Sequence, residues 1–308
     1  MQLPNSASRL CLTVAVCAAA AAFALAALSA PLATAKGKHR AKRQGSAVVF
    51  SDTGVNPDAT SIWGEIGCQN ESRAQVISSG GDTHPTITGA PQGDSSFRRL
   101  SVVDGDDFYG ERCELGQDFR SGPTVLYRPG KHRITELSVR LPSTFPLNVF
   151  TWQVVMQMKQ AGPSNNSGGT PVIELDAFDG RWLLRQSASA AESSDSRKLW
   201  SVPARIGTWT RFSFNVRYST RSSRGSIRIA VDRNGDGDFA DRRERSSRIH
   251  TYTLKVETRG GPNDHLPAGR PIPSHLRAGI YHDPAVSCPP PQGCAVDIDN
   301  IQVLRLPH

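Results

Sequence analysis

From Ala47 onward, short runs of alternating apolar and polar residues are separated by clusters of Gly, Pro, Asn, Asp and Ser. Alternation with a period of two is typical of half-buried β-strands, and we count roughly fourteen candidate strands and no convincing helix longer than two turns. The clearest candidate strands cover residues 134–141, 152–159, 172–178, 209–218, 225–232 and 295–304.

Many strands of even spacing without helical interludes predict an all-β fold, a two-sheet antiparallel sandwich. The pattern runs over residues 47–308, about 260 residues, which is too long for an immunoglobulin-sized unit and favours a single large jelly roll of the concanavalin-like kind. We find no internal repeat or low-complexity linker within it. Asp179-Gly180, between two apolar runs, predicts a tight hairpin turn.

The first 35 residues contain one charge, Arg9, then an apolar stretch, then small residues that end in Ala33-Thr34-Ala35. This order predicts a secretory signal peptide over residues 1–35. A retained membrane anchor is the alternative, because the apolar stretch is nearly long enough to span a bilayer. We therefore expect a secreted, extracellular protein whose mature chain has no membrane span.

The formal net charge is +8. Arg9 leaves with the signal peptide, and five basic side chains lie in residues 36–46, so the domain that follows retains a net charge of about +2. Residues 36–46 are expected to form a flexible, solvated basic arm; contact with an anionic polymer is the alternative. No folded motif with interleaved basic and aromatic residues follows, and we expect no nucleic-acid partner.

Four cysteines remain after the signal peptide: Cys68, Cys113, Cys288 and Cys294. In an oxidising compartment four thiols predict two disulfides, for which the sequence permits three pairings. We favour Cys288 with Cys294, which would close a Pro-rich loop, and this choice leaves Cys68 with Cys113. The C-x-x-C spacing typical of zinc sites is absent from the sequence.

Alternation also gathers polar side chains on one face of three candidate strands. The alternative is that these residues form an ordinary solvent-exposed surface without a function, because most antiparallel sheets have one solvated face. The residues expected to share a polar face are Gln153, Gln157 and Lys159; Arg112 and Glu114; and His275, Arg277, Tyr281 and Asp283.

Three of these segments resemble motifs of a known group. Arg112-Cys113-Glu114-Leu115, Gln157-Met158-Lys159 and Leu276-Arg277-Ala278-Gly279-Ile280-Tyr281 follow one another in the order of the R-[ST]-E-[LV], Q-[IV]-H and Y-F-K-A-G-x-Y motifs of jelly-roll alginate lyases. The layout of residues 95–303 looks most like heparin-lyase-I-like and glucuronan-lyase-like polysaccharide lyases. The resemblance implies β-elimination in a uronate-containing anionic polysaccharide, by an enzyme that needs no cofactor; we also expect a monomer.

The chemistry explains these residue types, because the C5 proton of a uronate is hard to remove until its carboxylate is neutralised. The resemblance implies this role for Arg112 and Gln157, and it implies that Tyr281 protonates the departing O4. A phenol is ordinarily protonated at neutral pH. A cation such as Arg277 or Lys159 would therefore have to stabilise the phenolate.

The sequence differs from the alginate lyase motif at Lys159, because alginate lyases have the histidine base at this position. Three alternatives stay open: the base is His84 or His275, Tyr281 acts as both acid and base, or the chain binds a carbohydrate without cutting it. His282 is a poorer candidate, because alternation turns it away from Tyr281. The residues expected to be catalytic are Tyr281, Lys159, Gln157 and Arg112. The residues expected to bind substrate are Arg277, His275, Glu114, Gln153 and His84.

A less favoured alternative is a laminarinase-like glycoside hydrolase. Glu174-Leu175-Asp176-Ala177-Phe178-Asp179 approximates the E-[IL]-D-x-x-E strand of those enzymes, whose paired carboxylates serve as nucleophile and acid. The last position is Asp179, which is one methylene shorter than glutamate and also begins the predicted Asp-Gly turn.

One loop matches the opening of a calcium-binding loop through Asp232, Asn234, Asp236 and Asp238. Arg243 occupies the twelfth position, where a bidentate glutamate belongs. A solvated hairpin tip is the favoured interpretation. Any calcium bound here is expected to be structural.

Overall fold

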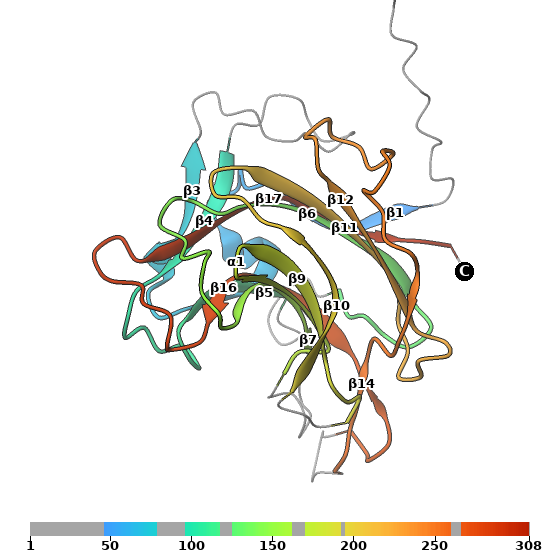
Figure 1. Ribbon diagram of the computed structural model, residues 1–308. Coiled ribbons are helices and arrows are strands. Elements are labelled where there is room, and N and C mark those ends of the chain that lie inside the picture. Colours follow the sequence, from blue (N-terminus) through green and yellow to red (C-terminus); the bar gives the residue numbers. More distant parts are fainter. Residues whose placement is uncertain are drawn as a thin grey trace, which may run out of the picture. The chain divides into compact units, whose positions relative to one another are not determined.

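Two antiparallel sheets face each other across an apolar core, as the alternating pattern predicts (Figure 1). The computed structural model describes residues 46–78, 96–117, 125–161, 170–191, 195–259 and 266–307. The predicted signal peptide, nearly all of the basic arm, and His84 lie outside these ranges.

The larger sheet has eight strands, in the order β13-β12-β11-β6-β17-β4-β3, with β1 also paired to β17. The long strand β17 is central, because its first part pairs with β4, its last part with β1, and most of its length with β6. The strands are β1 (Ala47–Asp52), β3 (Ala74–Ser78), β4 (Ser96–Val102), β6 (His132–Arg140), β11 (Trp209–Arg217), β12 (Ser226–Asp232), β13 (Ile249–His250) and β17 (Cys294–Arg305).

The smaller sheet has seven strands, in the order β10-β9-β8-β7-β16-β5-β2. In Figure 1 both sheets bend the same way, and the smaller sheet nests inside the larger one, so that its outer face is concave. The strands are β2 (Gly64–Cys68), β5 (Arg112–Gln117), β7 (Gln153–Gln160), β8 (Ile173–Phe178), β9 (Arg181–Ser187), β10 (Ser196–Pro203) and β16 (Ser274–His282).

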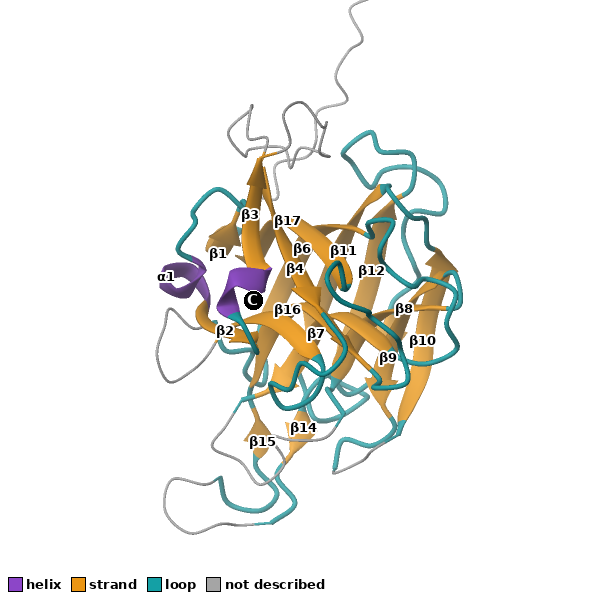
Figure 2. Ribbon diagram, turned by 90° about the vertical axis from the view of Figure 1, so that its left-hand side faces the viewer, coloured by secondary structure: helices purple, strands orange, loops and turns teal. Residues whose placement is uncertain are grey.

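Four short elements complete the described chain. The helix α1 (Ala59–Trp63) lies beside β2, and the two-stranded pair of β14 (Lys255–Val256) and β15 (Pro271–Ile272) lies beyond the ends of the large sheets (Figure 2). A 3₁₀ turn, η1 (Glu71–Arg73), precedes β3. The helices in the described ranges are all too short or too polar to cross a bilayer.

Aromatic and aliphatic side chains from both sheets fill the core between them. The ring centroid of Trp182 on β9 lies 5.3 Å from that of Phe212 on β11. The hydroxyl of Tyr218, just after β11, donates to the sulfur of Met158 on β7 at 3.1 Å. All four side chains are fully buried. The apolar positions of the alternating pattern therefore meet at the sheet interface, as expected for a sandwich.

Both predicted disulfides and the predicted hairpin are confirmed. Cys68 and Cys113 are bonded, and they are register partners on β2 and β5. Cys288 is bonded to Cys294 in the loop that leads into β17. The residues Asp179 and Gly180 both have positive φ angles, 45° and 71°, and form the tight turn between β8 and β9.

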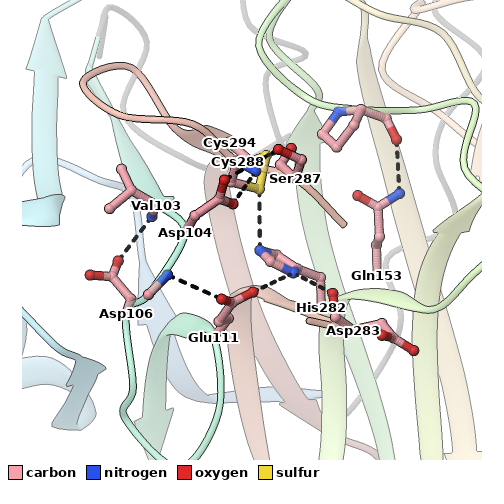
Figure 3. The surroundings of a disulfide bond; sticks show 12 residues. Val103, Asp104, Asp106, Glu111, Gln153, His282, Asp283, Ser287, Cys288 and Cys294 are labelled. Atoms are coloured by element: carbon pink, nitrogen blue, oxygen red, sulfur yellow. Dashed lines mark hydrogen bonds and ion pairs between the residues drawn. A yellow bond between two sulfur atoms is a disulfide. The ribbon is translucent and has the colours of Figure 1, made fainter. Parts of the chain in front are cut away.

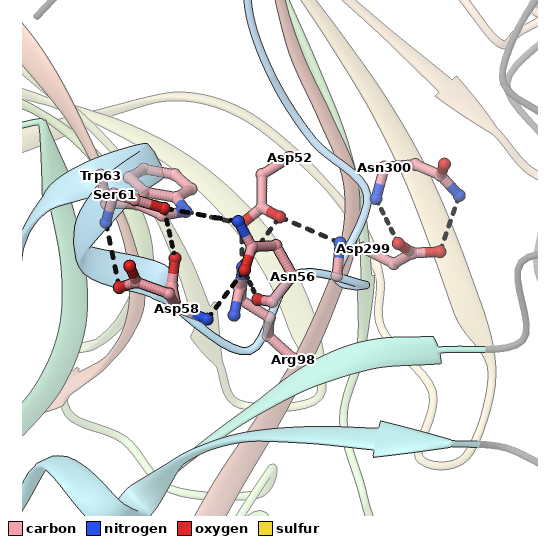
Figure 4. A network of polar contacts seen from close by, with 9 residues as sticks. Asp52, Asn56, Asp58, Ser61, Trp63, Arg98, Asp299 and Asn300 are labelled. Atoms are coloured by element: carbon pink, nitrogen blue, oxygen red, sulfur yellow. Dashed lines mark hydrogen bonds and ion pairs between the residues drawn. The ribbon is translucent and has the colours of Figure 1, made fainter. Parts of the chain in front are cut away.

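A buried ion pair joins the first strand to the rest of the fold (Figure 4). Asp52, at the end of β1, accepts hydrogen bonds at 2.6 Å from both Arg98 Nε on β4 and Trp63 Nε1 on α1. Arg98 also donates to the carbonyl oxygen of Asn56 at 2.7 Å. Because Asp52 and Arg98 are 4% and 3% exposed, each charge depends on the other for its partner.

We expect Asp52→Asn to lower the free energy of unfolding by about 3 kcal/mol, because it leaves the Arg98 guanidinium buried without a counterion. Denaturant unfolding followed by tryptophan fluorescence measures the change. Asp58→Asn is the matched control: Asp58 caps α1 from an exposed position, and asparagine caps a helix about as well as aspartate. Equal stability of the two variants would contradict the role of the ion pair.

Candidate active site

The outer face of the seven-stranded sheet brings the predicted motif residues together. Tyr281 of β16 is the register partner of Arg112 on β5, and Arg277 of β16 is the register partner of Gln157 on β7. Three stretches that are far apart in the sequence are therefore neighbours. We call this surface the polar face; its central residues are Arg112, Glu114, Gln157, Lys159, Arg277 and Tyr281.

The carboxylate of Glu114 lies at the centre of the polar face. It accepts a hydrogen bond from Gln157 Nε2 at 2.5 Å and one from Arg112 Nη1 at 3.4 Å, and Arg277 Nη1 lies 3.8 Å away. Arg277 also forms an ion pair of 2.5 Å with Glu65 of β2. Since Glu114 is fully buried, it fixes an amide and two guanidinium groups from three strands in one place.

The phenol ring of Tyr281 is held on the polar face between a cation and an indole. Arg112 Cζ lies 3.6 Å from the ring centroid, and the Trp152 ring lies edge-on at 4.7 Å. A Cβ at Gly110 would lie 3.1 Å from the ring, so the backbone there closes the remaining side. A guanidinium against the face of a phenol is attracted to its π electrons, and this contact helps to hold the ring in place.

Gly279 lies between Arg277 and Tyr281 on β16, and its register partner is Glu114. Its φ angle is 154°, and an added Cβ would lie 2.2 Å from the carbonyl oxygen of Cys113. The two strands therefore approach each other at a point where only glycine fits.

A β-bulge overturns one prediction about β7. The pairing of β7 with β8 shifts between Val154 and Met156, so Val155 and Met156 both belong to the buried core. For the residues that precede the shift, the side chains that regular alternation would place on one face of β7 therefore lie on the other. Gln153 therefore does not share a face with Gln157 and Lys159, as the sequence predicts, and Trp152 does.

Gln153 has a structural role in the fold. Its side chain is fully buried, and Nε2 donates to the carbonyl oxygens of Pro146 at 3.0 Å and Ala177 at 3.2 Å. The prediction that Gln153 binds substrate is therefore wrong. Trp152, which regular alternation would place on the face opposite Gln157 and Lys159, instead contacts Tyr281 on the polar face.

Lys159 lies on the polar face beside its register partner His275. Burial and the nearby positive charges of Arg112 and Arg277 lower the pKa of Lys159 to about 7, although Glu114 opposes the shift. A lysine with this pKa carries a large neutral fraction at neutral pH. It can therefore accept a proton there, which an ordinary lysine cannot do.

The two described histidines near the site have different surroundings. His275 is buried, and its Nδ1 lies 2.6 Å from the carbonyl oxygen of Gln117, so Nδ1 carries the hydrogen. The buried His282 ring lies on the other side of β16, where Nε2 is 3.2 Å from the sulfur of Cys288 and Nδ1 is 3.5 Å from a Glu111 oxygen (Figure 3). His282 is turned away from Tyr281, as predicted.

The candidate hydrolase carboxylates lie further along the polar face. Glu174 on β8 is the register partner of both Gln157 and Arg185, and Arg185 Nη1 lies 3.0 Å from Asp176. Burial raises the pKa of both carboxyl groups, and the charge of Asp176 raises that of Glu174 further. Asp179 serves the hairpin turn instead, with its φ of 45°.

The sequence analysis missed two charged residues, Glu65 and Lys255, that act on this face. Glu65 pairs with Arg277, and Lys255 of β14 exerts an electrostatic effect on Lys159 and Glu174. The alternation of residues 64–68 was a usable signal for Glu65. Lys255 lies in a strand of two residues, where no alternation exists to reveal it.

The predicted calcium loop is held by hydrogen bonds of its own. The two carboxylate oxygens of Asp232 accept the backbone N–H groups of Gly235 and Gly237, at 2.7 and 2.8 Å. Asp236 and Asp238 each accept a backbone N–H two residues further along. Across the described ranges, no three His, Cys, Asp or Glu side chains form a cluster that could hold a metal ion. Structural calcium at Asp232, Asn234, Asp236 and Asp238 stays a prediction.

Comparison with known proteins agrees with this geometry. A family model described as polysaccharide lyase matches residues 63–300. The fold is similar to an endo-β-1,4-glucuronan lyase from the fungus Trichoderma reesei, with a TM-score of 0.52 and 13% identity over 83% of this chain and 95% of that one. It is also similar to a marine PL-14 alginate lyase from Aplysia kurodai, with a TM-score of 0.53 and 12% identity over 84% and 99% of the two chains. A search of curated protein sequences finds no match.

The two packed antiparallel sheets define a jelly-roll sandwich. Because the family model covers well over half of the chain, the protein belongs to the polysaccharide lyase family. Its class of reaction is therefore elimination from a polysaccharide.

We expect Gly279→Ala to cost about 3 kcal/mol or more of stability, because the new methyl group collides with the backbone of Cys113. Thermal unfolding measures the loss. Gly105→Ala is the matched control, since Gly105 also has a positive φ, 88°, but nothing lies within 4 Å of the added Cβ. That control should lose only about 1 kcal/mol. Equal losses would show that close approach at Gly279 is unimportant.

Proposed function

We propose that this lyase cleaves a uronate-containing anionic polysaccharide by β-elimination, with Lys159 as base and Tyr281 as acid. The observation that carries the proposal is that Arg112 and Gln157 meet at Glu114, and that Arg112 also packs on the Tyr281 ring. Lys159 lies on the same face. The arrangement combines donors for a carboxylate with two groups able to move protons.

Arg112, Gln157 and Arg277 neutralise the sugar carboxylate by donating hydrogen bonds to it. Each already donates to or lies against Glu114, but a guanidinium has five N–H hydrogens and an amide has two, so further hydrogens remain for a ligand. Glu114 is fully buried and positions these donors. We therefore assign Glu114 a positioning role in place of the direct substrate contact expected from the sequence.

Proton removal at C5 falls to Lys159. Its pKa of about 7 gives it a neutral amine at neutral pH, and it stands where the alginate lyase motif has histidine. His275, the other described candidate, is anchored through Nδ1 to the carbonyl oxygen of Gln117. Because Lys159 occupies the position of the motif's histidine, we assign the base to Lys159 and not to His275.

The reaction balances with these two groups. The Lys159 amine takes the C5 proton, the electron pair forms the C4–C5 double bond, and the C4–O4 bond breaks. The Tyr281 hydroxyl donates its proton to O4, and the phenolate that remains is stabilised by the Arg112 guanidinium at 3.6 Å from the ring centroid. Proton transfer from the ammonium of Lys159 to the phenolate through water restores both groups.

We also propose that the protein acts outside the cell. The two disulfides, one between strands and one in a loop, support an oxidising compartment. The predicted signal peptide is compatible with this location.

The pH profile tests the base. Because the base must be neutral, we expect kcat/KM to rise with pH through an apparent pKa near 7. Lys159→Arg keeps a positive charge that does not titrate in this range, and it should lower kcat by about 10²- to 10⁴-fold and abolish the rise. Retention of the profile in Lys159→Arg would exclude Lys159 and leave Tyr281 or a histidine as the base.

The acid is tested by Tyr281→Phe, which keeps the ring and its contacts with Arg112 and Trp152 but removes the hydroxyl. We expect the ultraviolet absorbance of an unsaturated uronyl product to appear with the unaltered protein on glucuronan, alginate, heparin or hyaluronan. In the variant, the rate at which this absorbance rises should fall by about 10²-fold or more.

Two outcomes of that assay would contradict the proposal. Binding without any rise in absorbance would indicate a carbohydrate-binding protein. New reducing ends without ultraviolet absorbance, lost in Glu174→Gln, would indicate hydrolysis.

A further inference from the structure

Two exposed aromatic side chains flank the Tyr281 end of the polar face. Six large hydrophobic residues are exposed in the described ranges, and the only two aromatic ones are Tyr109, which is 84% exposed, and Phe150, which is 78% exposed. Tyr109 precedes Arg112 by three residues, and Phe150 precedes Trp152 by two. Single exposed apolar residues are common on ordinary protein surfaces, but these two aromatic residues both lie next to the site.

The loop that carries Tyr109 is internally bonded. Asp106 accepts the N–H of Val103 at 2.9 Å, and Asp107 accepts the N–H of Gly110 at 3.0 Å. Tyr109 has a φ of 56°, the left-handed region that non-glycine residues seldom adopt. Such a conformation persists only where the surroundings enforce it, and it often marks a functional position.

Backbone contacts fix Tyr109 at the edge of the reacting groups. Its carbonyl oxygen accepts a hydrogen bond of 2.6 Å from Arg112 Nη2, and the next residue, Gly110, lies against the Tyr281 ring. The side chain itself contacts the Phe108 ring edge-on at 5.3 Å. The ring of Tyr109 is therefore exposed, while the Arg112 guanidinium holds its backbone in place.

The loop that carries Phe150 is fixed in a similar way from the other side of β16. Asp283 N donates to the carbonyl oxygen of Trp152 at 3.2 Å, and Thr151 Oγ1 donates to Asp283 Oδ2 at 2.8 Å. On the opposite side, His282 N donates to the carbonyl oxygen of Glu111 at 3.2 Å. The end of β16 thus clamps both loops.

We propose that Tyr109 and Phe150 form an aromatic subsite that stacks against pyranose rings of the bound polysaccharide. The inference rests on the proposed function, because Tyr281 protonates O4 and therefore lies beside the sugar that departs with that oxygen. The subsite binds the part of the chain that becomes the new reducing end. Exposed aromatic faces suit the C–H faces of a sugar ring, and they add affinity that does not depend on the carboxylates.

The test measures binding in the Tyr281→Phe background, so that turnover does not interfere. Tyr109→Asn removes the ring but keeps a residue that tolerates a positive φ. We expect Tyr109→Asn and Phe150→Ala each to raise the Kd for the polysaccharide by about twofold to tenfold, the change that corresponds to loss of an aromatic contact. The probes are glucuronan, alginate, heparin and hyaluronan, each titrated separately.

A second readout does not depend on affinity. Tyr109→Trp should retain binding. When the polysaccharide binds, the fluorescence of the new indole should shift to shorter wavelength, and acrylamide should quench it less. Ile206→Ala is the control, because Ile206 is exposed but lies between β10 and β11. It should leave the Kd unchanged.

The outcomes separate the two proposals. Unchanged affinity in Tyr109→Asn and Phe150→Ala, with no fluorescence change in Tyr109→Trp, would overturn the aromatic subsite and leave the lyase intact. Failure of all four polymers to bind even when both rings are present would contradict the proposed function, and the subsite would fall with it.

Discussion

A buried carboxylate determines the arrangement of the site. Glu114 has no access to water, so its charge must be compensated by donors within the protein. Gln157, Arg112 and Arg277 supply that compensation from three adjacent strands. The same contacts that stabilise Glu114 hold an amide and two guanidinium groups together on the polar face. Folding and the arrangement of these donors therefore depend on one interaction.

Two irregularities of neighbouring strands give the site its shape. The bulge at Val155 and Met156 turns Trp152 onto the polar face, where it contacts Tyr281. In the adjacent strand the register with β7 shifts between Ala278 and Tyr281, next to Gly279. A regular sheet would place Trp152 in the core and remove one support of the phenol. β-Bulges commonly redirect side chains near active sites in this manner.

Much of this could be predicted from the sequence, because the determinants are local. Alternation predicted the strands, the spacing of the cysteines favoured the two disulfides that are present, and the order of the motifs predicted that Arg112, Gln157 and Tyr281 would meet. The exchange of Gln153 for Trp152 could not be predicted, since a bulge leaves no mark in an alternating sequence. The low pKa of Lys159 was equally hidden, because it arises from burial and from charges on other strands.

A polysaccharide lyase breaks the C–O bond of its substrate by elimination and not by hydrolysis. Mass spectrometry of the products from one defined uronic acid oligosaccharide tests it most directly. Elimination predicts two fragments whose masses sum to that of the substrate, one of them with a C4–C5 double bond. Fragments whose masses sum to the substrate plus one water would contradict it.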